Sequence, residues 1–112
     1  MSTLATELTP VTFDAALADE DVYVVDFWAE WCSPCTAYEP LVEAAVQEVD
    51  GGIALGRVDI AAYPELAERC GVSSVPALVV FRRGELAQRI FGVRTRQFLI
   101  NEFGRLTGAP PA

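Results

Sequence analysis

Apolar and polar residues follow two different periods along this chain, and together they predict alternating strands and helices. Residues 22–27 and 53–60 are β-rich, nearly continuous apolar runs, which is typical of strands covered on both faces of a sheet. Between them, apolar residues recur at helical spacing over residues 34–49, with Glu39 and Glu43 on the other face, and predict one long helix. A strand, a helix and a strand within this length predict a right-handed parallel crossover.

The remaining segments predict shorter elements around this unit. In chain order they are an edge strand at residues 4–8, a short helix at 12–18 capped by Thr12, a short helix at 61–70 ended by Gly71, a strand at 78–82, a turn at 83–85, a strand at 86–91 and a terminal helix capped by Thr95. Pro40 is expected to kink the long helix, and Gly51 and Gly52 to end it. The predicted fold class is α/β, with a mixed, centrally parallel sheet and helices on both faces.

The length and composition are those of a single domain. A chain of 112 residues with 52% hydrophobic residues has enough apolar surface for one core, so we predict one domain over residues 1–112, with a flexible tail at 108–112. Residues 1–8 lack the basic and long apolar regions of a signal peptide, and no later run is long enough to span a bilayer. We therefore expect a soluble, cytoplasmic protein without a membrane partner.

The net charge of -8 argues against nucleic acids and anionic membranes as partners. The charges are unevenly distributed, because residues 1–68 contain 14 acidic residues and one Arg, whereas residues 69–112 contain two acidic residues and seven Arg. One interpretation is that folding interleaves the two parts into an ordinary mixed surface. The other is a basic edge that meets acidic partners and is formed by Arg82, Arg83, Arg89, Arg94 and Arg96.

Cys32-Ser33-Pro34-Cys35 stands where the first long strand leads into the long helix. Sulfurs three residues apart at a helix start lie one turn apart, and Cys32 falls just outside the first turn, where unpaired backbone N–H groups stabilise a thiolate. Because the thiolate is the form that attacks sulfur, we expect Cys32 to attack and the less exposed Cys35 to resolve. Pro34 suits the first turn, where its missing N–H loses no hydrogen bond. The pattern predicts a redox-active disulfide.

Other roles for the cysteines fit less well. A zinc site needs about four ligands, and three cysteines without a histidine do not supply the usual set, so we expect no metal. A purely structural disulfide between Cys32 and Cys35 would close a loop too short to stabilise the fold much. Cys70 lies on the apolar stripe of its predicted helix, so we expect it to pack in the core rather than to react.

Asp26 interrupts the apolar run that precedes the cysteine pair. A carboxylate in a buried strand costs free energy unless it has a partner, and the position six residues before Cys32 favours a functional role over an ion pair or an edge position. Arg57 falls on the adjacent parallel strand and would hold Asp26 ionised to lower pH. The alternative is that the Arg57 side chain extends to solvent and leaves Asp26 unaffected.

Residues 25–35 read Val-Asp-Phe-Trp-Ala-Glu-Trp-Cys-Ser-Pro-Cys and resemble the active-site segment of the thioredoxin family. The resemblance extends over residues 13–106 and includes Pro40, Pro76, Gly84 and Gly92 at the positions where the family has them. It implies a thioredoxin-like fold and a protein-disulfide reductase, which is an electron carrier in cell redox homeostasis. It also implies a monomer without a bound cofactor that is recycled by a flavin-dependent, NADPH-driven thioredoxin reductase.

The resemblance further implies roles for particular residues. Asp26 would accept the proton of Cys35, and a cis Val75-Pro76 bond would lie beside the sulfurs, where the Val75 backbone pairs with a disulfide-containing protein substrate. The implied substrate surface is an apolar rim of Trp31, Pro34, Val75, Pro76, Gly92 and Val93.

Three residues depart from the family pattern. Ser33 replaces the usual glycine between the cysteines, Thr36 replaces the usual basic residue after them, and Arg57 replaces a lysine. Two alternatives to a reductase stay open at this point. The dithiol could serve as an oxidant or isomerase, since relative redox potentials set the direction of exchange. The fold could also be a binding subunit in which the thiols have no redox role.

Overall fold

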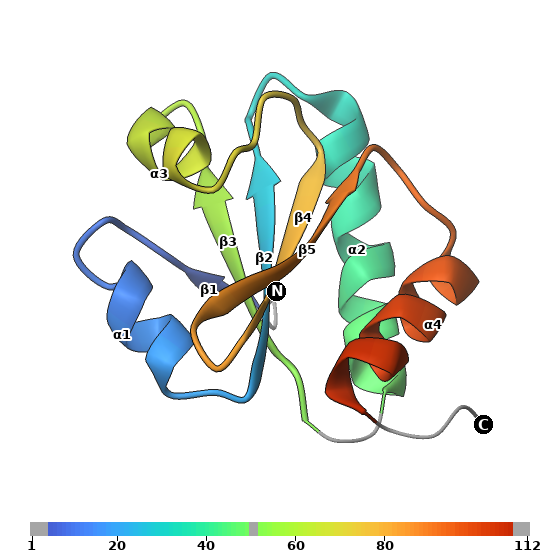
Figure 1. Cartoon of the computed structure of the whole chain (residues 1–112). Coiled ribbons are helices and arrows are strands. Elements are labelled where there is room, and N and C mark those ends of the chain that lie inside the picture. Colours follow the sequence, from blue (N-terminus) through green and yellow to red (C-terminus); the bar gives the residue numbers. More distant parts are fainter. Residues whose placement is uncertain (1–4, 50–51, 109–112) are drawn as a thin grey trace.

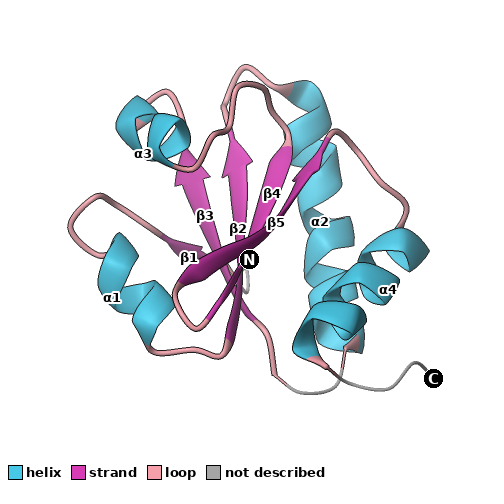
Figure 2. Cartoon of the chain, in the orientation of Figure 1, coloured by secondary structure: helices cyan, strands magenta, loops and turns pink. Residues whose placement is uncertain are grey.

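Five strands form one sheet in the order β1-β3-β2-β4-β5 in the computed structural model, which describes residues 5–49 and 52–108 (Figures 1 and 2). Strand β2 lies at the centre and pairs in parallel with β3 and antiparallel with β4, which confirms the predicted mixed sheet and the parallel crossover through α2. The elements in chain order are β1 (Thr6–Glu7), α1 (Phe13–Ala18), β2 (Val22–Trp28), α2 (Ser33–Glu48), β3 (Ala54–Asp59), α3 (Pro64–Arg69), β4 (Ala77–Arg82), β5 (Glu85–Phe91) and α4 (Arg96–Thr107).

Helices cover both faces of the sheet, as Figure 2 shows, with α1 and α3 on one face and α2 and α4 on the other. Each face of the sheet has its own hydrophobic core. Alternate residues of the central strand pack in one core or the other, because successive side chains of a strand point to opposite faces. Val25 and Phe27 pack in the core under α1 and α3, and Val24 packs in the core under α2 and α4. Asp26 has the same parity as Val24 and therefore faces α2.

Two predicted helix caps have different outcomes. The Thr95 hydroxyl accepts a hydrogen bond from the Phe98 N–H at 3.1 Å at the start of α4, which confirms that cap. Thr12 lies at the N-cap position of α1 but makes no side-chain capping bond, so that part of the prediction is wrong. The physical reason is local, because the Thr12 hydroxyl accepts a hydrogen bond from the Thr9 N–H at 3.0 Å instead.

The remaining element boundaries differ from the predicted ones by a few residues. Strand β1 begins at Thr6, and Leu4 lies outside the described residues. Helix α3 begins only at Pro64, because the Asp59 carboxylate accepts a hydrogen bond from the Ala61 N–H at 2.9 Å and holds residues 61 and 62 in a turn. Helix α2 ends at Glu48, ahead of the predicted end at Gly51, which also lies outside the described residues.

The hairpin between β4 and β5 turns on Arg83 and Gly84, which have φ angles of 52° and 84°. Positive φ at both central residues is the two-residue turn whose twist matches that of the flanking strands, and glycine adopts it without a steric cost. This turn places β5 at the edge of the sheet beside β4.

Ion pairs link the acidic first part of the chain to the arginines of the second. Arg69 pairs with Asp14, Arg96 pairs with Glu48, and Arg83 lies 3.9 Å from Asp21. These contacts favour the mixed surface over the basic edge.

Candidate active site

Cys32 and Cys35 form a disulfide at the N-terminus of α2, with their Cα atoms 5.3 Å apart. The pair lies where the chain leaves the carboxyl end of β2 and enters the helix, and Figure 1 shows the loop before β4 at the same end of the sheet. The two cysteines pack with Ala29, and Trp28, Ile60 and Val75 lie against this cluster. Strand β2 and helix α2 thus hold the two sulfurs from opposite sides.

The Cys32 sulfur is the N-cap of α2. Its Sγ accepts a hydrogen bond from the Cys35 N–H at 3.2 Å, which is the contact that a capping oxygen makes in other helices. A backbone N–H and the positive end of the helix dipole stabilise negative charge on an atom in this position. In the reduced protein, the same contact would favour the thiolate of Cys32.

The predicted difference in exposure between the two cysteines is small in the disulfide. Cys32 is 5% exposed and Cys35 is 2% exposed, so both count as buried. The two cysteines differ instead in the helix cap, because the Cys32 Sγ accepts the capping hydrogen bond and the Cys35 N–H donates it. Ser33 and Pro34 are exposed in the first turn of α2, and Thr36 is exposed after it.

Asp26 is buried beneath α2, with 4% of its surface exposed. Burial raises the pKa of Asp26 from 3.8 to about 7; the negative charge of Glu39 adds to this rise, Arg57 opposes it, and Glu43 adds less. The Oδ1 atom of Asp26 has no hydrogen-bond partner among the described residues. A carboxyl group with this pKa exchanges a proton near neutral pH, which is the property a proton acceptor needs.

Arg57 lies on the parallel strand adjacent to that of Asp26, as predicted, and the structure places the two residues in register. Its side chain does not extend to solvent, since only 15% of it is exposed. The guanidinium group pairs with Glu39 at 2.5 Å and with Glu7 at 3.1 Å, and it stacks on the Trp28 ring at 4.0 Å from the centroid. The alternative in which Arg57 leaves the protein interior is therefore wrong.

The predicted substrate rim is partly exposed. Trp31 and Val93 are 70% and 55% exposed, Pro34 is exposed, Val75 and Gly92 are half-buried, and Pro76 is buried. The Val75-Pro76 bond is cis, and the Pro76 carbonyl accepts a hydrogen bond from the Gly92 N–H at 3.0 Å. That bond joins the loop before β4 to the loop after β5.

Phe91 was not predicted as part of this rim, although 41% of it is exposed at the end of β5. Ile90 is buried, and successive side chains of a strand point to opposite faces of the sheet. This alternation is the sequence signal that places Phe91 on the face opposite to that of Ile90.

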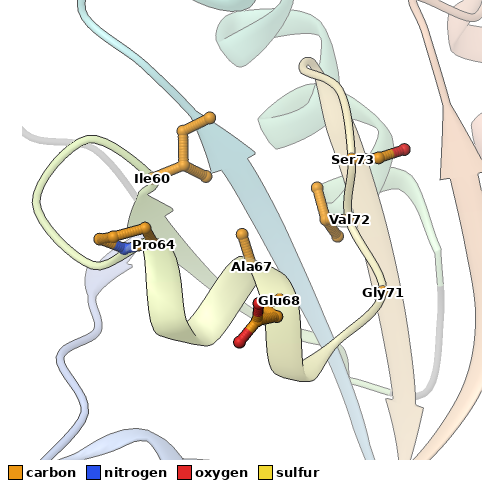
Figure 3. A pocket seen from close by; sticks show the side chains of 7 residues that line it. All are labelled: Ile60, Pro64, Ala67, Glu68, Gly71, Val72 and Ser73. Carbon is orange, nitrogen blue, oxygen red and sulfur yellow. The ribbon is translucent and has the colours of Figure 1, made fainter.

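A hollow of about 500 Å³ lies between α3 and the segment that follows it (Figure 3). Its walls are mainly apolar, and Ile60 joins it to the active site, because Ile60 also packs against the disulfide cluster. The residues that line the hollow are Ile60, Pro64, Ala67, Glu68, Gly71, Val72 and Ser73.

Cys70 is a free cysteine in the core formed by α1 and α3, with 3% of its surface exposed. Burial raises the pKa of its thiol. The structure thus confirms that Cys70 packs in the core, as its place on the apolar stripe predicts.

Within residues 5–49 and 52–108, no group of three or more His, Cys, Asp or Glu side chains is arranged to hold a metal ion. None of the helices in these two ranges is both long and apolar enough to cross a membrane.

A disulfide whose first sulfur caps a helix, beside a loop with a cis proline, defines a thiol-disulfide oxidoreductase site of the α/β class. Comparison with known proteins identifies the family within that class. The thioredoxin family profile matches residues 4–104, and the chain belongs to the thioredoxin family. Its Cys32–Cys35 pair has the geometry for dithiol-disulfide exchange.

Individual relatives agree with this assignment. The chain is 42% identical over 80 residues to the putative thioredoxin 2 of Streptomyces coelicolor, covering 71% of this chain and 59% of that protein. It is 31% identical over 97 residues to a bifunctional thioredoxin reductase/thioredoxin of Mycobacterium leprae, covering 86% of this chain and 21% of that protein. A solved thioredoxin variant from Halobacterium salinarum superimposes with a TM-score of 0.84 at 30% identity, covering 99% of each chain.

Proposed function

We propose that this chain is a general protein-disulfide reductase in which Cys32 attacks the substrate and Cys35 resolves the intermediate. The observation that supports this assignment most directly is the capping contact between the Cys32 sulfur and the Cys35 N–H. A cap stabilises charge on the atom that accepts the bond, so the thiolate should form preferentially on Cys32.

The reaction would proceed in two exchanges. The Cys32 thiolate attacks one sulfur of the substrate disulfide and forms a mixed disulfide with it, while the substrate S–S bond breaks and the other substrate sulfur leaves as a thiolate. Cys35 then loses its proton to Asp26 and attacks the Cys32 sulfur. The second substrate thiolate leaves, and the Cys32–Cys35 disulfide closes. Two electrons have moved from the protein dithiol to the substrate.

Asp26 suits the second exchange because it lies under the helix that begins with the two cysteines, and its pKa is raised to about 7. A carboxylate with that pKa takes a proton from a thiol far more readily than one with the ordinary value would. The substrate would contact the apolar rim, which consists of Trp31, Pro34, Val75, Gly92 and Val93. The cis peptide bond between Val75 and Pro76 would hold the Val75 backbone beside the sulfurs.

Recycling requires an external reductant, and we assign this role to a thioredoxin reductase. The name of the Mycobacterium leprae relative, which joins a thioredoxin reductase to a thioredoxin in one chain, supports this choice. The protein would then act as a monomeric, cytoplasmic electron carrier without a bound cofactor, and residues 1–112 would form one domain.

Trapping of the intermediate tests the order of attack. We expect Cys35→Ser to accumulate a mixed disulfide with a substrate protein such as insulin, because Cys32 still attacks and nothing resolves. Cys32→Ser should accumulate little, because Cys35 lacks the cap. Non-reducing electrophoresis with mass spectrometry measures both. Equal trapping by the two variants would contradict the assignment of roles.

Turnover of the unmodified protein distinguishes a reductase from the two alternatives, which are an oxidant or isomerase and a binding subunit. With NADPH and thioredoxin reductase, we expect continuous reduction of insulin and none with the Cys32→Ser, Cys35→Ser variant. An oxidant would instead form disulfides in a reduced substrate faster than it reduces insulin. A binding subunit would keep its biological function in the double variant.

A further inference from the structure

Three charged residues form one row across the sheet on the side covered by α2. Glu7 of β1 is in register with Arg57 of β3, and Arg57 is in register with Asp26 of β2. Arg57 therefore has a carboxylate on either side of it within one row. A guanidinium group between two carboxylates at adjacent strand positions can pair with either one.

The guanidinium group forms its ion pairs with two other carboxylates, those of Glu7 and Glu39. Within residues 5–49 and 52–108, no cation forms an ion pair with Asp26, whereas Arg57 pairs with Glu7 and Glu39. The two pairs differ in burial. The Glu7 side chain is 63% exposed and is therefore screened by solvent, but that of Glu39 is only 21% exposed. The contact with Glu39, at 2.5 Å, is therefore the shorter and less screened of the two.

Glu39 is an unusual residue for its place on α2. The helical pattern puts it on the polar face, yet it is partly buried over the sheet, one turn before Glu43, whose Oε2 atom is buried without a hydrogen-bond partner among the described residues. Two like charges at this spacing destabilise a helix by a few tenths of a kcal/mol. These two partly buried carboxylates lie near a third carboxyl group, that of Asp26, which is buried.

We propose that Glu39 is a positioning residue for the dithiol exchange, because it holds Arg57 against Trp28 and so keeps Asp26 free of a cationic partner beneath α2. Without Glu39, Arg57 would turn to the buried carboxylate in its row, that of Asp26. Asp26 would then be locked as a paired carboxylate and would be a weaker proton acceptor. This inference rests on the proposed role of Asp26 in the second exchange.

The other groups that face Asp26 are consistent with this arrangement. Glu43 and Tyr38 face it from α2, Arg57 faces it from β3, and the residue in register on β4 is the apolar Leu78. Arg57 is the cation with the largest effect on the pKa of Asp26. The position of a single guanidinium group therefore decides whether Asp26 has a partner.

Carboxylate carbon NMR of the oxidised protein measures the Asp26 titration directly. We expect Glu39→Gln to lower the midpoint by about one pH unit or more, since an opposite charge within a few ångströms has an effect of that size. In an Arg57→Met background, the same substitution removes only the repulsion between Glu39 and Asp26, so the midpoint should fall by less. Arg57→Gln replaces Arg57→Met if the latter does not fold.

Glu43→Gln is the matched control, because it removes a carboxylate near Asp26 that does not pair with Arg57. Its effect on the Asp26 midpoint should be the same with and without Arg57. The proposal is overturned if Glu39→Gln lowers the midpoint equally in the two backgrounds, or does not lower it at all.

The same variants separate this inference from the proposed function. The pH profile of the Cys35 resolving step, followed by release of substrate from the mixed disulfide, should move down with the Asp26 midpoint in Glu39→Gln. If the NMR midpoint moves and the kinetic profile does not, Glu39 positions Arg57 as inferred, but Asp26 is not the proton acceptor and that part of the proposed function fails.

Discussion

Replacing Asp26 by asparagine should stabilise the protein at high pH and should do so progressively less as the pH falls. The pKa of Asp26 is raised in the folded protein, so the folded state binds a proton more tightly than the unfolded chain does. Stability that depends on this proton is present below about pH 4, where both states are protonated, and is lost as the pH rises to about 7. The asparagine side chain does not titrate in this range, so the stability of the variant does not fall as the pH rises through about 7.

The magnitude follows from the two pKa values. The difference between 3.8 and about 7 is roughly three units, and each unit is worth about 1.36 kcal/mol, so the carboxylate costs the folded state about 4 kcal/mol above pH 7. A domain of this size is stable by only about 5–15 kcal/mol, so the effect is a large fraction of the total.

Urea unfolding of the oxidised protein from about pH 5 to about pH 8.5 measures this difference, because the chain contains no histidine and few other side chains titrate within this window. Asp14→Asn is the matched control, because the hydrogen bond from Arg69 holds the pKa of Asp14 below 3.8 and its titration lies below the window. The variant-minus-parent difference should rise with pH for Asp26→Asn and stay flat for Asp14→Asn.

A flat difference for Asp26→Asn over the same window would refute the reasoning. It would mean that Asp26 has a similar pKa in the folded and unfolded states, and therefore that burial and Glu39 do not disfavour its charged form. The proposed roles of both Asp26 and Glu39 would fall with it.

Two further predictions concern residues away from the proton acceptor. Thr95→Ala should lower the free energy of unfolding by about 1 kcal/mol because it removes the cap of α4, whereas Thr12→Ala should cost less because Thr12 makes no capping bond; urea unfolding of both variants tests this, and equal losses would contradict it. Cys70→Ala should retain insulin reduction, and the parent should form no Cys70-linked dimer on a non-reducing gel after peroxide, because the thiol is buried. A large loss of activity in Cys70→Ala would show that Cys70 does more than pack.

The sequence predicted the elements that depend on local pattern. The β-rich run of β2 and the helical spacing of α2 are strong periodic signals, and the structure places both within a few residues of the predicted bounds. The placement of Asp26 and Arg57 on adjacent parallel strands was also predicted, whereas their exact register comes from the structure. The redox-active disulfide could be predicted from the spacing of the two cysteines and their place at a helix start alone.

What the pattern could not supply is the partner of each charged side chain. Glu39 and Glu43 fall on the polar face of α2 by periodicity, yet the helix lies close enough to the sheet for Glu39 to reach Arg57. That contact depends on how α2 packs on the sheet, which is a tertiary property. Thr12 shows the same limit at short range, because a neighbouring threonine N–H competes with the helix for its hydroxyl.

One atom serves both the fold and the chemistry in this protein. The Cys32 sulfur caps the longest helix among the described residues, so the atom that reacts is also the atom at which that helix begins. By reciprocity, whatever orders the first turn of α2 also favours the thiolate, and formation of the thiolate strengthens the cap. The thiolate and the first turn of α2 therefore stabilise each other, and the disulfide keeps the cap in place because the same sulfur still accepts the bond.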